Sequence, residues 1–164
     1  MTFMDHLFVF GAKDLFLLSG ALALTWFWRL PGRQKKEAAV FAAVALPAIY
    51  AVSRVAAGLY FDPRPFVVGH FAPLVPHAPD NGFPSDHMLL VSAIASVIFP
   101  FSRRWSSAAW TVAILVGAAR VYVGVHHPID VIGSAVIAII VSAPTYFVVD
   151  WYMRRRAMLA QKGP

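Results

Sequence analysis

The chain has 164 residues, of which 59% are hydrophobic and only 13% are charged. Soluble domains are about 45–50% apolar and about 25% charged, so this composition excludes an ordinary water-soluble domain. The net charge of +6 does not indicate nucleic-acid binding, because the basic residues form short clusters between apolar runs and no nucleic-acid-binding motif accompanies them. The absence of cysteine excludes disulfides, a thiolate nucleophile and cysteine-based metal sites. We expect one integral membrane domain over residues 1–164.

The apolar runs predict the helices of this domain. A bilayer-spanning helix needs about 20 mostly apolar residues. The short apolar segment 3–12 predicts an interfacial or re-entrant helix that leads into the first span. Five longer apolar runs follow, at residues 15–30, 38–61, 88–101, 108–125 and 129–152. The third is short and needs help from its neighbours. The predicted fold class is an all-α, polytopic membrane helical bundle with about five spans and a short N-terminal interfacial helix.

One long connection, residues 62–84, separates the second span from the third. It is rich in glycine and carries five prolines before its last residue, which exclude a continuous regular helix. Long loops without secondary structure are uncommon, and they are often lids or binding loops. We therefore expect this loop to contribute to a functional site.

Basic residues predict how the bundle is oriented. With five spans, three clusters fall on one side of the membrane, which the positive-inside rule assigns to the cytoplasm. These clusters contain ten of the 14 basic residues: Arg29, Arg33, Lys35, Lys36, Arg103, Arg104, Arg154, Arg155, Arg156 and Lys162. The other four lie at or toward the opposite side. We expect an extracytoplasmic N-terminus and a cytoplasmic C-terminus.

Polar and charged residues from three separate stretches gather at the predicted outer end. Charged groups in membrane segments are costly unless they are paired, and they mark functional sites by default. We therefore expect a single site built from Arg54, Arg64, Ser85, Asp86, His87, Arg120, His126, His127 and Asp130.

The first two stretches have features of anion binding. Arg64 lies between two prolines, so a stiff backbone presents its guanidinium, which suits phosphate oxygens. Ser85 occupies the N-cap position before an apolar helix, where free N–H groups and the positive helix end favour anions. Ser85 and Asp86 alone are also compatible with simple helix capping. His87 enters the membrane zone without an evident local partner.

The third stretch combines a buried base with a carboxylate. Pro128 suits the first position of the last helix, which places Asp130 in its first turn. Asp130 can then reach back toward His126 and fix its tautomer, as in a nucleophile with an orienting group. Arg120 lies inside the fourth span, where an unpaired guanidinium needs an anion or a carboxylate. Arg54 is also compatible with a side chain that reaches toward the membrane surface.

These stretches together resemble the type 2 phosphatidic acid phosphatase superfamily, whose signature is K-x6-R-P, then P-S-G-H, then S-R-x5-H-x3-D. Arg64-Pro65 matches the first motif and Pro84-Ser85-Asp86-His87 the second. The third is matched from Arg120 through His126 to Asp130 with its spacing intact. The motifs lie in order between residues 57 and 130. The P-S-D-H form resembles the bacterial undecaprenyl-diphosphatase branch linked to bacitracin resistance.

Three positions depart from the family pattern. Ala57 stands where the family has lysine, and Arg54, one helical turn earlier, is a candidate substitute. Asp86 replaces the glycine of the second motif, and Ala119 replaces the serine of the third. The sequence provides no physical account of what the Asp86 carboxylate does beside phosphates.

The resemblance implies a catalytic or binding role for each residue of the site. His126 attacks phosphorus and forms a phosphohistidine, Asp130 orients it, and His87 protonates the leaving oxygen. Phosphate oxygens are held by Arg64, Arg120, Ser85 and the backbone at Asp86, with Arg54 as a further candidate. The expected substrate is undecaprenyl diphosphate, which is converted to the monophosphate for reuse as a carrier lipid in cell-wall synthesis. No cofactor or metal is expected, and the partners are this polyprenyl diphosphate and membrane lipids.

Several alternatives stay open at this stage. The motifs describe the phosphate and not the tail, so phosphatidic acid, phosphatidylglycerol phosphate and lipid A are rival substrates. Ser85 as an esterase nucleophile lacks the G-x-S-x-G turn. A transporter or channel is disfavoured because the polar residues cluster at one end. A metal site is disfavoured because His126 and His127 are adjacent and diverge. The sequence does not indicate the oligomeric state.

Overall fold

A computed structural model describes residues 1–161 and shows seven helices among them. They are α1 (Phe3–Lys13), α2 (Phe16–Arg29), α3 (Gly32–Leu59), α4 (Pro65–Val68), α5 (Asp86–Ile98), α6 (Arg103–Tyr122) and α7 (Pro128–Gln161). The described residues contain no strand, and one isolated β-bridge joins Pro63 to Asn81. The predicted all-α fold is therefore confirmed. Lys162, part of the third basic cluster, lies outside the described residues.

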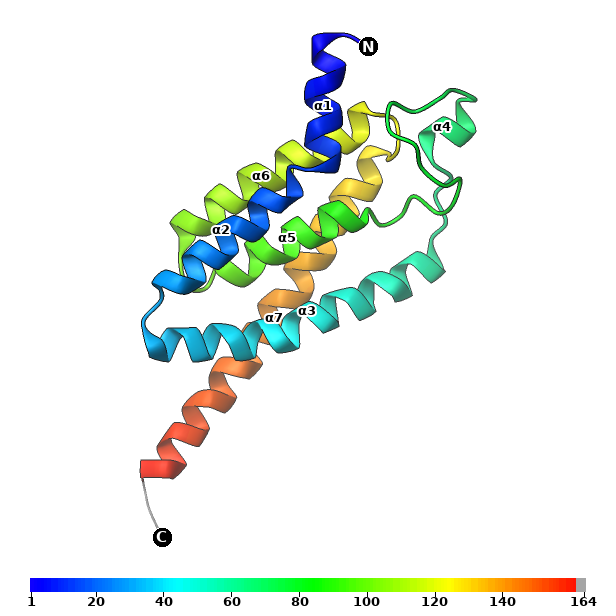
Figure 1. The fold of residues 1–164 in the computed structure, drawn as a ribbon. Helices are drawn as coiled ribbons and strands as arrows, with labels where there is room; N and C mark the ends of the chain where they lie inside the picture. The colour runs from blue at the N-terminus through cyan, green and yellow to red at the C-terminus, as the bar shows by residue number, and fades with distance from the viewer. Residues whose placement is uncertain (162–164) are drawn as a thin grey trace.

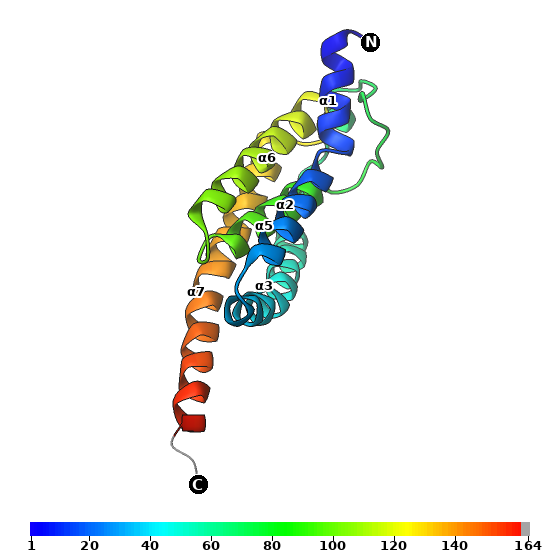
Figure 2. The same ribbon diagram turned by 60° about the vertical axis from the view of Figure 1, so that its left-hand side comes forward.

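The short helix α5 is the centre of the bundle. It packs mainly against α6 and α7, and also against α2 and α3 (Figures 1 and 2). Nine of its 13 residues are buried. An α-helix rises about 1.5 Å per residue, so α5 is about 20 Å long, less than the roughly 30 Å apolar core of a bilayer. The sequence-based description of this segment as short is confirmed.

The helices around α5 expose large apolar side chains. Leu24, Val55, Leu59, Ile114 and Phe147 are each more than 60% exposed. Such a surface is costly in water and is expected where lipid surrounds the protein. The core inside is filled by smaller clusters, one of which joins Ile49, Leu89 and Ile137 from α3, α5 and α7.

The number of membrane spans differs from the sequence-based prediction. Among the described residues, α3 and α7 are long and apolar enough to cross a membrane. The pair α1 and α2, bent by 48° at the break, adds a third span if it is counted as one. The predicted N-terminal helix over 3–12 thus exists as α1. Helices α5 and α6 do not meet the length and apolarity criteria, so the prediction of five spans is not confirmed.

The two ends of the bundle have different chemistry. The connections α2–α3 and α5–α6 and the end of α7 lie away from α1, α4 and the α6–α7 turn in both views (Figures 1 and 2). The predicted basic clusters lie at the former end, together with five cation–π contacts that include Arg29 with Trp105 and Arg155 with Trp151. The predicted site residues lie toward the other end. The long proline-rich loop forms only the single turn α4, as its composition predicts.

Candidate active site

Asn81 ties the long loop to the end of α3. Its side-chain nitrogen donates to the carbonyl oxygens of Ala57 and Tyr60, each at 3.0 Å. Its side-chain oxygen accepts from the backbone N–H of Asp62 at 2.9 Å and of Phe83 at 3.0 Å. The amide therefore uses two donor and two acceptor positions at once. This holds the beginning and the end of the loop against α3, so the residues between them have a defined place.

Arg64 is buried at the N-terminal end of α4, where its side chain is 6% exposed. Its Nε donates to Asp80 Oδ1 at 2.7 Å, and Nη1 donates to the carbonyl oxygen of Val125 at 2.9 Å. A further contact joins Nη1 to His126 Nε2 at 3.4 Å. Pro63 and Pro65 on either side fix the local φ angles, so the guanidinium points inward from a stiff backbone. Arg64 of the first motif therefore contacts His126 of the third motif.

Arg120 reaches the same histidine from the last turn of α6. Its Nη2 lies 3.2 Å from His126 Nε2, and its Nη1 donates to the carbonyl oxygen of Ala12 at 3.4 Å. Its Nε is buried without a partner, and no ion pair joins Arg120 to a carboxylate within residues 1–161. A buried, unpaired cation is costly. Among residues 1–161, Asp80 is paired with Arg64 but no carboxylate is paired with Arg120, so the convergence of the two guanidinium groups favours a bound anion.

The contacts of His126 define its tautomer. Nδ1 lies 3.2 Å from Asp130 Oδ2, and both groups are buried. Nε2 faces Arg64 and Arg120, whose guanidinium groups can only donate hydrogen bonds. Nε2 must therefore accept, and the proton must lie on Nδ1, which donates it to Asp130. The Nε2 lone pair thus points to the place where the arginines would hold an anion, which is the arrangement of a nucleophile.

The turn between α6 and α7 places this histidine. Gly124 has a φ of +79°, and a side chain there would come within 2.6 Å of the Phe71 ring. Glycine is therefore required on two grounds, backbone conformation and space. Pro128 begins α7 as predicted. Asp130 Oδ2 also accepts the backbone N–H of His127 at 2.9 Å, so one carboxylate stabilises the turn and orients the His126 ring.

Burial and the two arginines keep His126 neutral. Burial is the main reason that the pKa of His126 is lowered from its ordinary value. The positive charges of Arg120 and Arg64 lower that pKa further, whereas the hydrogen bond to Asp130 acts in the opposite direction. A neutral imidazole has the free lone pair that nucleophilic attack requires. The environment therefore favours the reactive form near neutral pH.

The second motif lies beside this pair at the start of α5. Ser85 is in the N-cap position, but its Oγ makes no cap hydrogen bond and is buried without a partner among the described residues. Its backbone N–H donates to the carbonyl oxygen of Asp130 at 3.4 Å. No described histidine contacts the Oγ, so the esterase alternative lacks its base. Asp86 is exposed in the first turn of α5, and its carboxylate makes no hydrogen bond within the described part of the chain.

His87 is half-buried, and its ring packs edge-on against Phe16 with centroids 5.1 Å apart. It lies within electrostatic reach of Arg120 and His126, and it makes no hydrogen bond to any of residues 1–161. Its ring nitrogens are therefore available to a substrate. This is the arrangement that a proton donor to a leaving group needs.

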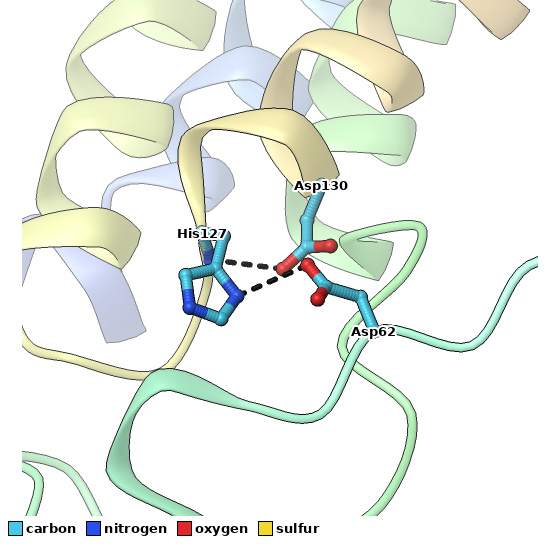
Figure 3. Close-up of side chains that lie close together, drawn as sticks. All are labelled: Asp62, His127 and Asp130. Carbon is cyan, nitrogen blue, oxygen red and sulfur yellow. Dashed lines mark hydrogen bonds and ion pairs between the residues drawn. The ribbon is translucent and has the colours of Figure 1, made fainter. Parts of the chain in front are cut away.

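Asp62, His127 and Asp130 form a second group (Figure 3), and Asp130 also contacts His126. His127 Nδ1 lies 3.0 Å from Asp62 Oδ2, and three potential metal-ligand atoms lie within 4.8 Å of one another. His127 Nδ1 is already hydrogen-bonded to Asp62, and Asp130 Oδ2 already accepts the His127 backbone N–H and the His126 Nδ1–H. These atoms are therefore occupied by protein hydrogen bonds. We therefore interpret the group as a hydrogen-bonded cluster rather than a metal centre. His126 and His127 have different carboxylate partners, Asp130 and Asp62 respectively.

The structure brings together most of the predicted site residues. Arg64, Arg120, His126 and Asp130 are in direct contact, and Ser85 and His87 lie beside them. Arg54 is exposed on α3, and no described contact links it to this cluster. Its predicted role in phosphate binding, like that of Asp86, stays a prediction.

Sequence reasoning missed four groups that support the site: Asp62, Asp80, Asn81 and the carbonyl oxygen of Ala12. Asp62 precedes Pro63-Arg64 directly, so its place in the first motif was a usable signal. Asp80 and Asn81 lie in an irregular loop with no periodicity, and Ala12 contributes only backbone. No sequence signal could have identified these three.

The fold and site together place the chain in a known family. Residues 38–154, more than half of the chain, match the PAP2 superfamily, and the chain belongs to it. All three motifs lie inside the matched range.

Comparisons with individual proteins agree with this family. The chain is 33% identical over 138 residues to the undecaprenyl-diphosphatase BcrC of Bacillus subtilis, which covers 84% of this chain and 71% of that protein. It is 34% identical over 133 residues to the putative undecaprenyl-diphosphatase YbjG of Escherichia coli, which covers 80% of this chain and 66% of that protein. The crystal structure of Aquifex aeolicus LpxE has the same fold, with a TM-score of 0.70 and 23% identity over 88% of this chain and 86% of that one.

Proposed function

We propose that this protein is an undecaprenyl-diphosphate phosphatase that releases phosphate and the lipid monophosphate through a phosphohistidine at His126. The observation that carries the proposal is the geometry of His126, whose Nε2 faces two buried arginines while Nδ1 contacts Asp130. A neutral nucleophile and two cations at one point suit a phosphoryl group. The names of the BcrC and YbjG relatives support the choice of lipid diphosphate.

The reaction has two balanced steps. The Nε2 lone pair attacks the terminal phosphorus, the N–P bond forms, and the bond to the bridging oxygen breaks. His87 gives its proton to that oxygen, which leaves as the lipid monophosphate. Water then attacks the phosphohistidine, His87 takes a proton from that water, and the N–P bond breaks to release inorganic phosphate. Arg64 and Arg120 stabilise the charge on the equatorial oxygens in both steps.

The lipid tail has a matching surface beside the site. An apolar groove of about 800 Å³ runs between α6 and α7. Its lining includes Met88 and Pro128, which adjoin His87 and His127, and continues down the helices through Ala118, Ile132 and Val136. A diphosphate held by the arginines would therefore extend its chain into this groove and toward the bilayer. A lipid with a single polyisoprenoid chain fits a single groove of this kind.

We further propose that the site faces the extracytoplasmic side of a five-span bundle, with α1 as an interfacial helix. The basic clusters and their cation–π contacts lie at the other end, which the positive-inside rule assigns to the cytoplasm. Helix α5 is shielded by its neighbours, so it does not need the length of a lipid-facing span. Extracytoplasmic labelling of a cysteine placed at His70, which is exposed in the long loop, would support this orientation.

The test is phosphate release by the full-length protein in detergent. The substrate panel contains undecaprenyl diphosphate, phosphatidic acid, phosphatidylglycerol phosphate and lipid A. We expect the highest kcat/KM with undecaprenyl diphosphate, and no release by His126→Ala with retained folding. Release by His126→Ala equal to that of the wild type would refute the nucleophile assignment. A higher kcat/KM with another lipid would refute the proposed substrate, and release from none of them would favour the transporter alternative.

A further inference from the structure

The Asp62 carboxylate contacts His127 and has no role in the two reaction steps proposed for His126 and His87. It is 15% exposed and comes from the loop just before α4, whereas Asp130 and His127 come from the start of α7. Its backbone is fixed on both sides, since Asn81 accepts its N–H and its carbonyl oxygen accepts the N–H of Gly82 at 2.8 Å. A carboxylate held so firmly has a defined position relative to its neighbours.

We propose that Asp62 is a positioning residue of the active site, which clamps the His127 ring and stands beside Asp130 so that the turn presents His126 to the phosphate. This inference rests on the proposed function. The contacts form one chain. Asp62 Oδ2 lies 3.0 Å from His127 Nδ1, and the His127 backbone N–H donates to Asp130 Oδ2 at 2.9 Å (Figure 3). Asp130 Oδ2 in turn lies 3.2 Å from His126 Nδ1.

The packing around Asp130 depends on the same loop. Gly82 lies against the carboxylate, so a side chain there would come within 2.9 Å of Asp130 Oδ2 and 3.1 Å of the Asp62 carbonyl oxygen. The loop that carries Asp62 thus covers Asp130 directly and shields it from water. A carboxylate in such surroundings interacts more strongly with the imidazole that it orients.

Asp62 also adds a negative charge near the pair. Burial raises the pKa of Asp62, and the nearby negative charge of Asp130 raises it further. The same negative charge favours the protonated form of a nearby imidazole. Among residues 1–161, five titratable or charged groups face His126. They are Asp130 on α7, Arg120 on α6, Arg64 before α4, His87 on α5 and His77 in the loop. The His77 ring lies edge-on to that of His126. Asp62 acts on this balance through Asp130.

Asp62→Asn removes the charge but keeps the shape and one oxygen. Loss of a negative charge lowers the pKa of His126, and looser positioning lowers the rate of attack. We expect the pKa of His126, measured by NMR on protein labelled at histidine nitrogens, to fall by roughly half a unit to one unit. We expect kcat for undecaprenyl diphosphate to fall about tenfold with KM unchanged, because Asp62 does not contact the phosphate. Asp62→Glu keeps the charge and should retain the His126 pKa.

Asp5→Asn is the matched control, since it removes a partly exposed carboxylate at the same end that contacts Thr2 and Tyr122 and does not contact His126. It should leave both the His126 pKa and kcat unchanged. An unchanged His126 pKa in Asp62→Asn, with a lowered melting temperature as the only effect, would overturn the inference. So would a divalent-cation requirement that Asp62→Asn abolishes, because the cluster would then be a metal site. The NMR measurement needs no substrate, so a failure of the proposed function would be visible separately, as absence of turnover by the wild type.

Discussion

Replacement of Asp130 by asparagine tests how His126 is activated. The carboxylate is fully buried, and its Oδ2 lies 3.2 Å from His126 Nδ1. Attack on phosphorus places positive charge on the imidazole as the N–P bond forms. At that distance, with an effective dielectric constant of about 20, a full positive charge would be stabilised by about 5 kcal/mol. A neutral amide dipole recovers part of this, so we expect Asp130→Asn to lower kcat by about a thousandfold, or about 4 kcal/mol.

The assay is single-turnover phosphate release from undecaprenyl diphosphate, with circular dichroism and thermal unfolding to verify the fold. KM should change little, because Arg64 and Arg120 still hold the phosphate. Ser134→Ala is a suitable control, since the Ser134 hydroxyl donates to the Asp130 carbonyl oxygen at 2.7 Å but does not reach the carboxylate. A variant whose kcat stays within tenfold of the wild type would show that the carboxylate does not orient or stabilise the nucleophile as inferred.

Three further outcomes are expected. The acidic limb of the pH profile of kcat/KM should have its midpoint below the ordinary histidine pKa of about 6.5, because burial lowers the pKa of His126 and the neutral form persists to lower pH. A midpoint above that value would contradict this explanation. The control is to repeat the profile with a substrate whose phosphate has a different pKa. Gly82→Ala should lower kcat/KM at unchanged membrane insertion, because its side chain would come within 2.9 Å of the Asp130 carboxylate; wild-type kinetics would refute the close approach. Ala118→Trp should fill the groove and raise KM about tenfold for undecaprenyl diphosphate but not for the shorter farnesyl diphosphate. The reason is that losing the burial of a few methylenes costs more than about 1.4 kcal/mol, which is a tenfold change in affinity. Equal effects on both substrates would mean that the lipid tail binds outside this groove.

Sequence reasoning predicted the parts of the site that depend on local spacing. Arg120, His126 and Asp130 are separated by one helix end and one tight turn, so their mutual placement follows from where α6 ends and α7 begins. The start of α7 at Pro128 was predicted for the same reason. Local rules fail in the loop, because Asp80 and Asn81 acquire their partners only when residues 16 to 24 positions apart meet in space.

The span count shows a second limit of local patterns. Hydropathy treats each segment as if lipid surrounded it, but α5 is surrounded by other helices and can be short. Hydropathy also cannot predict which way the Arg54 side chain faces, because the packing of α3 against its neighbours decides which face of this helix is exposed. Ser85 illustrates a third limit, since its position as N-cap was predicted whereas its hydroxyl turned out to have no cap partner. That free hydroxyl is compatible with the predicted role in phosphate binding.

The contact between Arg120 and the carbonyl oxygen of Ala12 has a practical consequence for protein engineering. A fragment trimmed to the family match, residues 38–154, would keep every signature residue and lose the Ala12 carbonyl oxygen that accepts from this arginine. It would also lose α1 and α2, which pack against α6, so it would carry all of the motifs without the support for the Arg120 guanidinium. Expression tags are therefore better attached at the C-terminus, beyond α7, than in front of α1.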